Sequence, residues 1–265
     1  MRARGGQQRR SPWESALEKF LKPWRRKPEV VAALAVGSRV QGTSTPNSDI
    51  DVHIILKPGV KWRQRGNCYV DGFLIEYFSN PVEQLKVYRE ADRQSFSRID
   101  ARMFALGRIV FDKDGILRRL QASATRELTV PFRKLAPAEL EMAKYGLWDD
   151  LDNLRDLVSA ESGWYRYAHH LLLARALESY RRYLGAETGA PAKLERFFTD
   201  KSFRRGYAIP DFPDPEFVRL FGSAVRDETF RRIERLVRHV LRRMGGFEID
   251  GWKLRSPVSA LKRRG

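Results

Sequence analysis

Short apolar runs and alternating segments dominate residues 30–78, and they predict β-strands rather than helices. Val31–Val36 is apolar at every position, which is typical of a strand that is buried on both faces. Asp49–Leu56 alternates between polar and apolar residues in its first half, so it predicts a strand with one buried face. Asn67–Val70 and Phe73–Phe78 flank Asp71-Gly72, a dipeptide that favours a two-residue turn, and together they predict a β-hairpin.

Other segments complete the expected N-terminal part. Ser11-Pro12 predicts the start of a helix, with Ser11 as its N-cap and Pro12 in its first turn. The apolar residues of this helix recur with a helical period: Trp13, Ala16, Leu17, Phe20, Leu21 and Trp24. Downstream, Arg108–Phe111 predicts a further short strand, and a helix is expected from Ile116.

Beyond residue 139 the apolar positions recur every three or four residues, the pattern of amphipathic helices. Three stripes predict three long helices, and shorter helices are expected near Ala192–Phe198 and Pro215–Gly222. The stripes are Leu140, Ala143, Leu147, Leu151, Leu154 and Val158; Trp164, Tyr167, Leu171, Ala174, Leu177, Tyr180 and Leu184; and Phe230, Ile233, Val237, Val240 and Met244. Pro131 and Pro137 lie in the irregular stretch between the two patterns and indicate a domain boundary.

The two patterns predict an α+β fold in which a mixed-sheet domain is followed by an all-α helical bundle. The expected segments are a flexible basic arm over residues 1–10, the sheet domain over 11–126, the bundle over 127–246 and a C-terminal tail over 247–265.

The amino-acid composition indicates the kind of molecule that the protein binds. The chain carries 50 Lys and Arg against 33 Asp and Glu, a formal net charge of +17, which favours phosphate-bearing partners such as nucleotides or nucleic acid. A single cysteine, Cys68, excludes an internal disulfide framework and any cysteine-rich zinc site, and it is consistent with a cytoplasmic protein. The longest strictly apolar run, Val30–Val36, is too short to span a membrane, and no secretory signal is expected.

A glycine-serine pair and three carboxylates carry the candidate chemistry. Asp49 and Asp51 share one face of a predicted strand, where a divalent cation such as Mg²⁺ would neutralise their repulsion. Gly37-Ser38 follows the first strand and precedes a predicted helix, so its backbone N–H groups and hydroxyl are placed to bind phosphate. Glu76 lies in an otherwise apolar strand, where a carboxylate is costly unless a cation or hydrogen bonds compensate it.

Each of these features alone also has an ordinary structural explanation. Asp49 and Asp51 would fit a solvated strand face, and Gly37-Ser38 would fit a common strand-to-helix turn. Glu76 would fit an edge strand from which its side chain reaches solvent.

Together, these residues resemble the DNA polymerase β-like nucleotidyltransferase superfamily, and within it the minimal and aminoglycoside-type nucleotidyltransferases. The family pattern is Gly-Ser, a spacer of about ten residues, Asp-x-Asp and a third carboxylate on a later strand. Gly37-Ser38, Asp49-x-Asp51 and Glu76 follow this order. The helical half is similar, more loosely, to the bundle that follows the catalytic domain in kanamycin- and streptomycin-type enzymes.

The resemblance implies a metal-dependent transfer of a nucleoside monophosphate, most simply AMP from ATP, to an acceptor hydroxyl with release of pyrophosphate. Asp49 and Asp51 would bind two Mg²⁺ ions, and Glu76 would be either a third metal ligand or the general base. These two roles of Glu76 remain open at this point.

The same resemblance assigns the phosphates of ATP or another NTP to Gly37, Ser38 and the nearby backbone. Arg39 is adjacent and could support phosphate, although an arginine here could equally be solvated. Lys193, in the helical half, could reach the triphosphate, and its alternative is an ordinary surface lysine.

The acceptor is expected to be a small hydroxylated molecule such as an aminoglycoside-like antibiotic, with RNA or a protein as other possibilities. Asp149, Asp150 and Asp152 cluster beside Trp148, as a site for a polycationic ring would require, but a solvated acidic helix face near Arg155 is the favoured interpretation. The net charge of +17 opposes a polycationic substrate.

Two features of the helical half point elsewhere. The helix expected over Arg226–Arg243 carries arginines away from its apolar stripe, as in helices that contact nucleic-acid phosphates or are simply solvated. His169-His170 lies in an apolar helix without metal-ligand spacing to another His or Cys, so packing and a surface hydrogen bond are expected. The rival function is a non-catalytic nucleotide- or RNA-binding protein.

Overall fold

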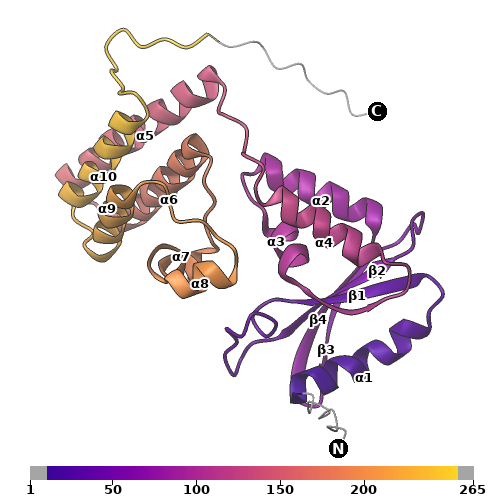
Figure 1. The fold of residues 1–265 in the computed structure, drawn as a ribbon. Coiled ribbons are helices and arrows are strands. Elements are labelled where there is room, and N and C mark those ends of the chain that lie inside the picture. The colour runs from indigo at the N-terminus through magenta and orange to yellow at the C-terminus, as the bar shows by residue number, and fades with distance from the viewer. Residues whose placement is uncertain (1–10, 256–265) are drawn as a thin grey trace, which may run out of the picture. The chain divides into compact units, whose positions relative to one another are not determined.

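The computed structural model describes residues 11–255, and these form two compact units. The first unit runs up to Val130 and also includes Asp200–Pro210, whereas the second comprises Pro131–Thr199 and the residues from Asp211 onward (Figure 1). The basic arm predicted for residues 1–10 and the last ten residues of the predicted tail lie outside the described residues.

A mixed five-stranded sheet is the centre of the first unit, with strand order β3-β4-β2-β1-β5. The strands are β1 Val30–Val36, β2 Ile50–Leu56, β3 Gln64–Val70, β4 Phe73–Pro81 and β5 Arg108–Asp112. Only the β2–β4 pair is parallel among these neighbours; the other pairs are antiparallel. All five strand predictions and the mixed-sheet fold class are therefore confirmed.

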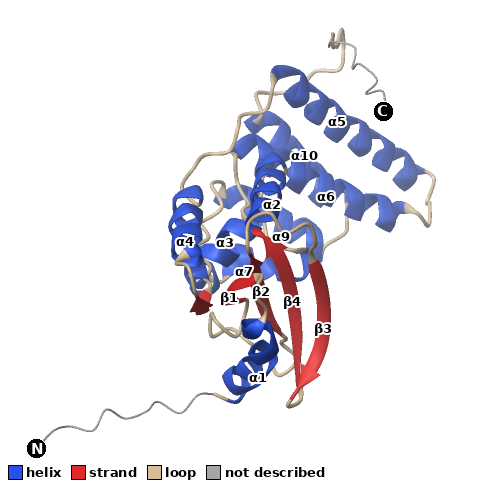
Figure 2. Cartoon of the chain, turned by 90° about the vertical axis from the view of Figure 1, so that its right-hand side faces the viewer, coloured by secondary structure: helices blue, strands red, loops and turns tan. Residues whose placement is uncertain are grey.

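The β3–β4 hairpin forms at the predicted turn. Asp71 and Gly72 both have positive φ, 49° and 80°, as a two-residue turn between right-twisted strands requires. The turn joins β3 to β4, which lie side by side in the sheet (Figure 2). It sets a register that runs from Val70 opposite Phe73 to Gln64 opposite Ser79.

Helices cover both faces of the sheet (Figure 1). The first helix, α1 Pro12–Arg26, begins at the predicted N-cap, where the Ser11 backbone N–H donates to the Glu14 carboxylate over 2.7 Å. Its apolar stripe packs on the face formed by Ala33, Val52, Ile54 and their neighbours. The opposite face, with Leu34 and Ile55, is covered by α2 Val82–Gln94, α3 Ile99–Leu106 and α4 Ile116–Glu127.

The sequence pattern does not reveal α2 and α3, because few of their positions are apolar and buried. In α2 the buried residues are Leu85 and Arg89. The Arg89 guanidinium lies 3.4 Å from the Asp100 carboxylate of α3 and donates to the Leu120 carbonyl of α4. At this junction a buried arginine joins the helices, whereas a search for hydrophobic periodicity expects an apolar residue there.

A short segment from the helical half of the sequence belongs to the sheet unit. Asp200–Pro210 contains α8 Lys201–Gly206 and had been expected within the bundle. The Tyr207 hydroxyl lies 3.0 Å from the Thr43 hydroxyl, and the Arg102 side chain donates to the Tyr207 carbonyl over 2.7 Å. These contacts tie the segment to the loop that follows β1.

The second unit consists of helices packed around an apolar core. Its elements are α5 Pro137–Ser159, α6 Tyr165–Leu184, η1 Pro191–Lys193, α7 Leu194–Thr199, α9 Pro215–Arg226 and α10 Phe230–Arg243. The predicted stripe of α10 is confirmed, since Ile233, Val237 and Val240 are fully buried. None of the helices within residues 11–255 is long and apolar enough to cross a membrane.

The stripe predicted for α6 is wrong over its first half. Trp164, Tyr167 and Leu171 are 72%, 61% and 51% exposed. The buried face is instead His169, Leu172, Leu173, Ala176 and Tyr180. The helix has one face rich in aromatic residues and one rich in aliphatic residues, and the neighbouring helices pack on the aliphatic face.

The expectation for the histidine pair is confirmed. His169 is buried and bonds the Ala224 carbonyl, whereas His170 is exposed beside Glu228.

Candidate active site

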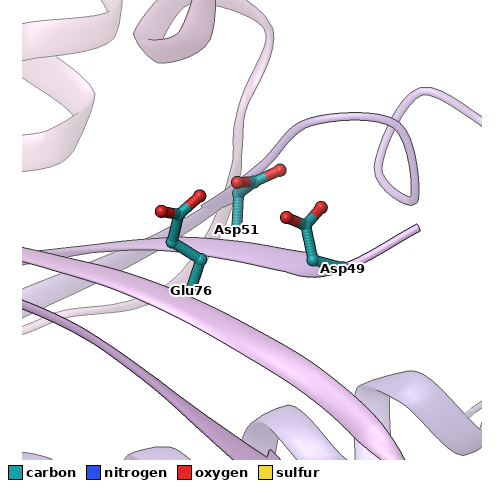
Figure 3. Close-up of side chains that lie close together, drawn as sticks. All are labelled: Asp49, Asp51 and Glu76. Carbon is teal, nitrogen blue, oxygen red and sulfur yellow. The ribbon is translucent and has the colours of Figure 1, made fainter. Parts of the chain in front are cut away.

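Three carboxylates meet where β2 begins, on the sheet face shared with α2–α4. Asp51 of β2 is directly opposite Glu76 of β4 in the parallel register, and Asp49 immediately precedes β2. One carboxylate oxygen from each of the three residues lies within 4.8 Å of the others. Figure 3 shows the side chains projecting in the same direction from the two neighbouring strands. The structure therefore brings together all three carboxylates that were singled out from the sequence.

The turn after β1 packs directly against this cluster. Gly37 has φ +79°, and a Cβ added there would stand 2.2 Å from Asp51 Oδ2. No L side chain fits without displacing the carboxylate, and the positive φ is itself unfavourable for residues other than glycine. The glycine is thus required both for the turn and for the position of Asp51.

We expect Gly37→Ala to weaken metal binding at the carboxylates at least about tenfold, because the new methyl group must displace the Asp51 side chain. Mn²⁺ binding, measured by paramagnetic resonance on the purified variant, reports this displacement.

The matched control is Gly59→Ala. Gly59 has φ +83° and nothing within 4 Å of an added Cβ, so it imposes similar backbone strain without the clash. Both variants are expected to lose about 1 kcal/mol of stability, whereas only Gly37→Ala loses metal affinity. Equal Mn²⁺ affinity in the two variants would show that the glycine does not position Asp51.

The helix predicted after Gly37-Ser38 does not form. Residues 37–42 make tight turns, closed by hydrogen bonds from Gln41 N–H to the Gly37 carbonyl and from Thr43 N–H to the Ser38 carbonyl. An extended helix N-terminus is therefore absent at this point. Within residues 11–255 the Ser38 hydroxyl has no hydrogen-bond partner, so it is available to a ligand.

Arg39 has a structural task. Its guanidinium donates to the backbone carbonyls of Ser48 and Asp49 and lies 4.9 Å from the centre of the Phe73 ring. It thereby holds the end of the loop, and with it Asp49, against the sheet. Phosphate binding by Arg39 stays a prediction.

Glu76 does not lie on an edge strand, because β4 runs between β3 and β2 (Figure 2). Its carboxylate accepts a 2.6 Å hydrogen bond from Arg65 of β3, and its side chain is 21% exposed. Arg65 lies outside the predicted strand, which begins at Asn67, whereas β3 begins at Gln64. Extending the hairpin register past Asn67 places residue 65 diagonal to residue 76.

A pocket of about 640 Å³ continues the same sheet face beyond Glu76. Its walls include His53, Phe78, Arg65, Asn80 and Tyr88. His53 is two residues along β2 from Asp51, stacks on Phe78 with ring centres 5.2 Å apart, and has no hydrogen-bond partner for either ring nitrogen among the described residues. Burial lowers the pKa of His53 to about 4, so the ring is neutral at physiological pH.

The residues predicted from the helical half belong to the second unit. Lys193 is exposed at the end of η1 in the second unit, and its contact with a triphosphate stays a prediction. In the acidic group of α5, Asp150 pairs with Arg175 and Asp152 pairs with Arg155, at 2.6 and 2.5 Å. These pairs favour the interpretation of a solvated helix face.

A comparison with protein-family models agrees with this geometry. A family model described as "Nucleotidyltransferase domain" matches residues 17–101, which include Gly37 and all three carboxylates. Among solved structures, a nucleotidyltransferase-like protein from Exiguobacterium sibiricum is similar, with 14% identity, coverage of 88% of this chain and 74% of that chain, and a TM-score of 0.46. None of the curated proteins matches the sequence. Residues 17–101 of this chain are therefore a nucleotidyltransferase domain of the DNA polymerase β-like superfamily.

Proposed function

We propose that the protein is a metal-dependent enzyme that transfers a nucleoside monophosphate, AMP from ATP, to a hydroxyl of a small acceptor and releases pyrophosphate. The observation that carries the proposal is the convergence of Asp49, Asp51 and Glu76 beside the Gly37 turn, within a nucleotidyltransferase domain. Transfer to an acceptor hydroxyl is the reaction for which such a domain needs both a phosphate-binding turn and adjacent carboxylates.

The donor set fits Mg²⁺. Three half-buried carboxylates offer hard oxygen ligands within 4.8 Å of one another, and Mg²⁺ prefers carboxylate and phosphate oxygens. When bound, the metal would supply Lewis-acid polarisation of the α-phosphate and neutralise charge on the triphosphate.

The protein groups have separate tasks in this proposal. The Ser38 hydroxyl and the backbone N–H groups of the turn hold the β- and γ-phosphates. Asp49 and Asp51 hold the metal, and Arg39 keeps Asp49 in place through the loop carbonyls. Glu76, oriented by the Arg65 hydrogen bond, is the third carboxylate ligand.

The acceptor would lie in the pocket beyond Glu76. Its volume of about 640 Å³ suits a molecule of drug size, and its walls combine ring faces with amide and phenol groups. The lining also carries two arginines and two aspartates, so the pocket offers both hydrogen-bond donors and acceptors to a hydroxylated molecule. These four residues are Arg63, Arg65, Asp92 and Asp100. An aminoglycoside finds less support, since Asp150 and Asp152 are already paired with arginines.

The test is transfer of label from each α-³²P-labelled NTP in the presence of Mg²⁺. Acceptors are offered in parallel: aminoglycosides, neutral hydroxylated small molecules, bulk tRNA and cell lysate. We expect label from ATP on a small molecule, together with release of pyrophosphate. NTP binding without transfer or pyrophosphate release in every arm would overturn the proposal and favour a non-catalytic nucleotide-binding protein.

A further inference from the structure

Four arginines form a straight stripe along α10. Arg231, Arg235, Arg238 and Arg242 follow each other at spacings of four, three and four residues, so they lie on one face, one turn or about 5.4 Å apart. All four are exposed, and the opposite face of the helix is buried in the core of the second unit. The stripe is therefore a continuous row of positive charge.

Local acids neutralise this row only in part. Arg238 pairs with Glu234 at 2.9 Å, and Arg242 lies 3.3 Å from His239 Nδ1. Within the part of the chain that the structure describes, Arg231 and Arg235 have no acidic partner. Free guanidinium groups at regular spacing are suited to successive phosphates.

The stripe ends in a pocket of about 650 Å³. Arg238 and Arg242 line it, together with Arg155 of α5. Its apolar walls include Trp148 and Phe247, whose ring centres are 6.3 Å apart. The pocket thus combines aromatic and apolar surface with three guanidinium groups and two carboxylates, those of Asp152 and Glu248. Asp152 pairs with Arg155, so the guanidinium groups that the pocket offers to a phosphate are those of Arg238 and Arg242, where the stripe ends.

This combination matches the two parts of a nucleotide unit. An aromatic surface stacks on a base of any sequence, and arginines bind the phosphate attached to it. The pocket volume lies within the usual range for one small ligand, whereas Arg231 and Arg235 lie along the helix beyond the pocket lining. The unused arginines favour a ligand that continues along the helix.

We propose that the second unit binds single-stranded nucleic acid, with a base in the Trp148–Phe247 pocket and the adjoining phosphates along the arginine stripe of α10. A duplex keeps its bases stacked, so it cannot place one in the pocket. A membrane surface is disfavoured because the apolar face of α10 is buried and cannot insert between lipids. The proposal goes beyond nucleotidyl transfer and does not depend on it.

The test is fluorescence anisotropy of a 12-nucleotide 5′-fluorescein-labelled oligouridine with the full chain, in EDTA without Mg²⁺ or NTP. The unsubstituted chain is the parent, because without a metal ion the carboxylates of Asp49 and Asp51 repel phosphate and oppose binding at that site. We expect Arg235→Glu/Arg242→Glu to weaken binding at least about 30-fold and to reduce the slope of log K against log salt from about −3 to about −1.5. Trp148→Phe, which keeps an aromatic ring, should retain binding within about threefold.

The matched control is Arg118→Glu/Arg119→Glu on α4, which changes the net charge by the same amount at two exposed positions of the other unit. Equal weakening by the two double variants would show a general charge effect and overturn the proposal. It is also overturned if a 12-base-pair duplex or an anionic phosphatidylserine vesicle binds as tightly as the oligouridine. UMP competing as well as the oligomer would restrict the site to a free nucleotide and contradict the role of the stripe. None of these readouts requires transferase activity, so the proposal and the proposed function fail separately.

Discussion

Replacing Asp51 by asparagine is expected to lower nucleotidyl transfer about 1,000-fold, which corresponds to about 4 kcal/mol of lost transition-state stabilisation. The physical reason is the position of Asp51 at the centre of the site: it is opposite Glu76 in the sheet and in contact range of Gly37. An amide keeps the shape of the side chain but removes the negative charge that a divalent cation requires. Label transfer at saturating Mg²⁺ and ATP measures the effect.

Asp71→Asn is the matched control for this substitution. It makes the same chemical change in the same unit, at an exposed turn position where Asn-Gly is as favourable as Asp-Gly. We expect wild-type transfer from the control and an unchanged melting temperature in EDTA for both variants. Undiminished transfer by Asp51→Asn, with Mn²⁺ affinity retained, would remove the carboxylate cluster from the mechanism.

The largest loss of stability is expected from Asp214→Ala, at about 3 kcal/mol. Asp214 is 7% exposed and is the N-cap of α9, where it accepts the backbone N–H of Phe217 over 3.0 Å. Its other oxygen accepts the Tyr180 hydroxyl at 2.5 Å and lies 2.8 Å from His239 Nε2. Truncation leaves these buried polar groups from three helices without a partner, and the free energy of unfolding in urea measures the cost.

Glu216→Ala is the control for Asp214→Ala. Glu216 is in the first turn of the same helix, but it is half-exposed and pairs with Arg219 on the surface. A solvent-exposed pair of this kind contributes little to stability, so a similar loss in both variants would show that the buried network does not stabilise the second unit.

The same network predicts an acid dependence of stability. Burial opposes ionisation of Asp214, but the hydrogen bonds from Tyr180, the Phe217 N–H and His239 outweigh it and lower its pKa from 3.8 to about 2. In that window the unfolded chain binds more protons than the folded chain, so this stabilisation is complete at neutral pH and is lost as the pH falls from about 4 to about 2. The stability difference between wild type and Asp214→Asn should shrink over this range in urea titrations. A constant difference would contradict the assignment.

Local preferences of the chain explain why most of the sheet unit was predictable. Three features were set by neighbouring residues alone and did not depend on tertiary packing. They are the turn at Asp71-Gly72, the apolar run of β1 and the alternation around Asp51. Because strand residues two apart share a face, the pairing of Asp49 with Asp51 follows directly. Membership of the nucleotidyltransferase superfamily, suggested by the same residues, is confirmed for residues 17–101.

Other predictions were wrong where one stretch of sequence is compatible with more than one local structure. Gly37-Ser38 suits a helix start as well as a tight turn, and only the packing of Gly37 against Asp51 selects the turn. In α6 two faces have similar apolar content, and the packing neighbours choose the aliphatic one. The α2 helix is held by a buried arginine, which no hydrophobic period can reveal.

The sequence by itself identified the groups on which the proposals rest: the carboxylates, the glycine, the strands that carry them and the arginine-rich helix. Only the tertiary structure decided that Glu76 lies opposite Asp51 on a central strand, that Asp200–Pro210 packs with the sheet unit, and that the α10 arginines end in an aromatic pocket. The physical reason is the distance along the sequence over which each kind of interaction acts. Turn and strand preferences are set by neighbouring residues, whereas register between distant strands, cavities and ion pairs depends on how whole elements pack, and many packings share one local pattern.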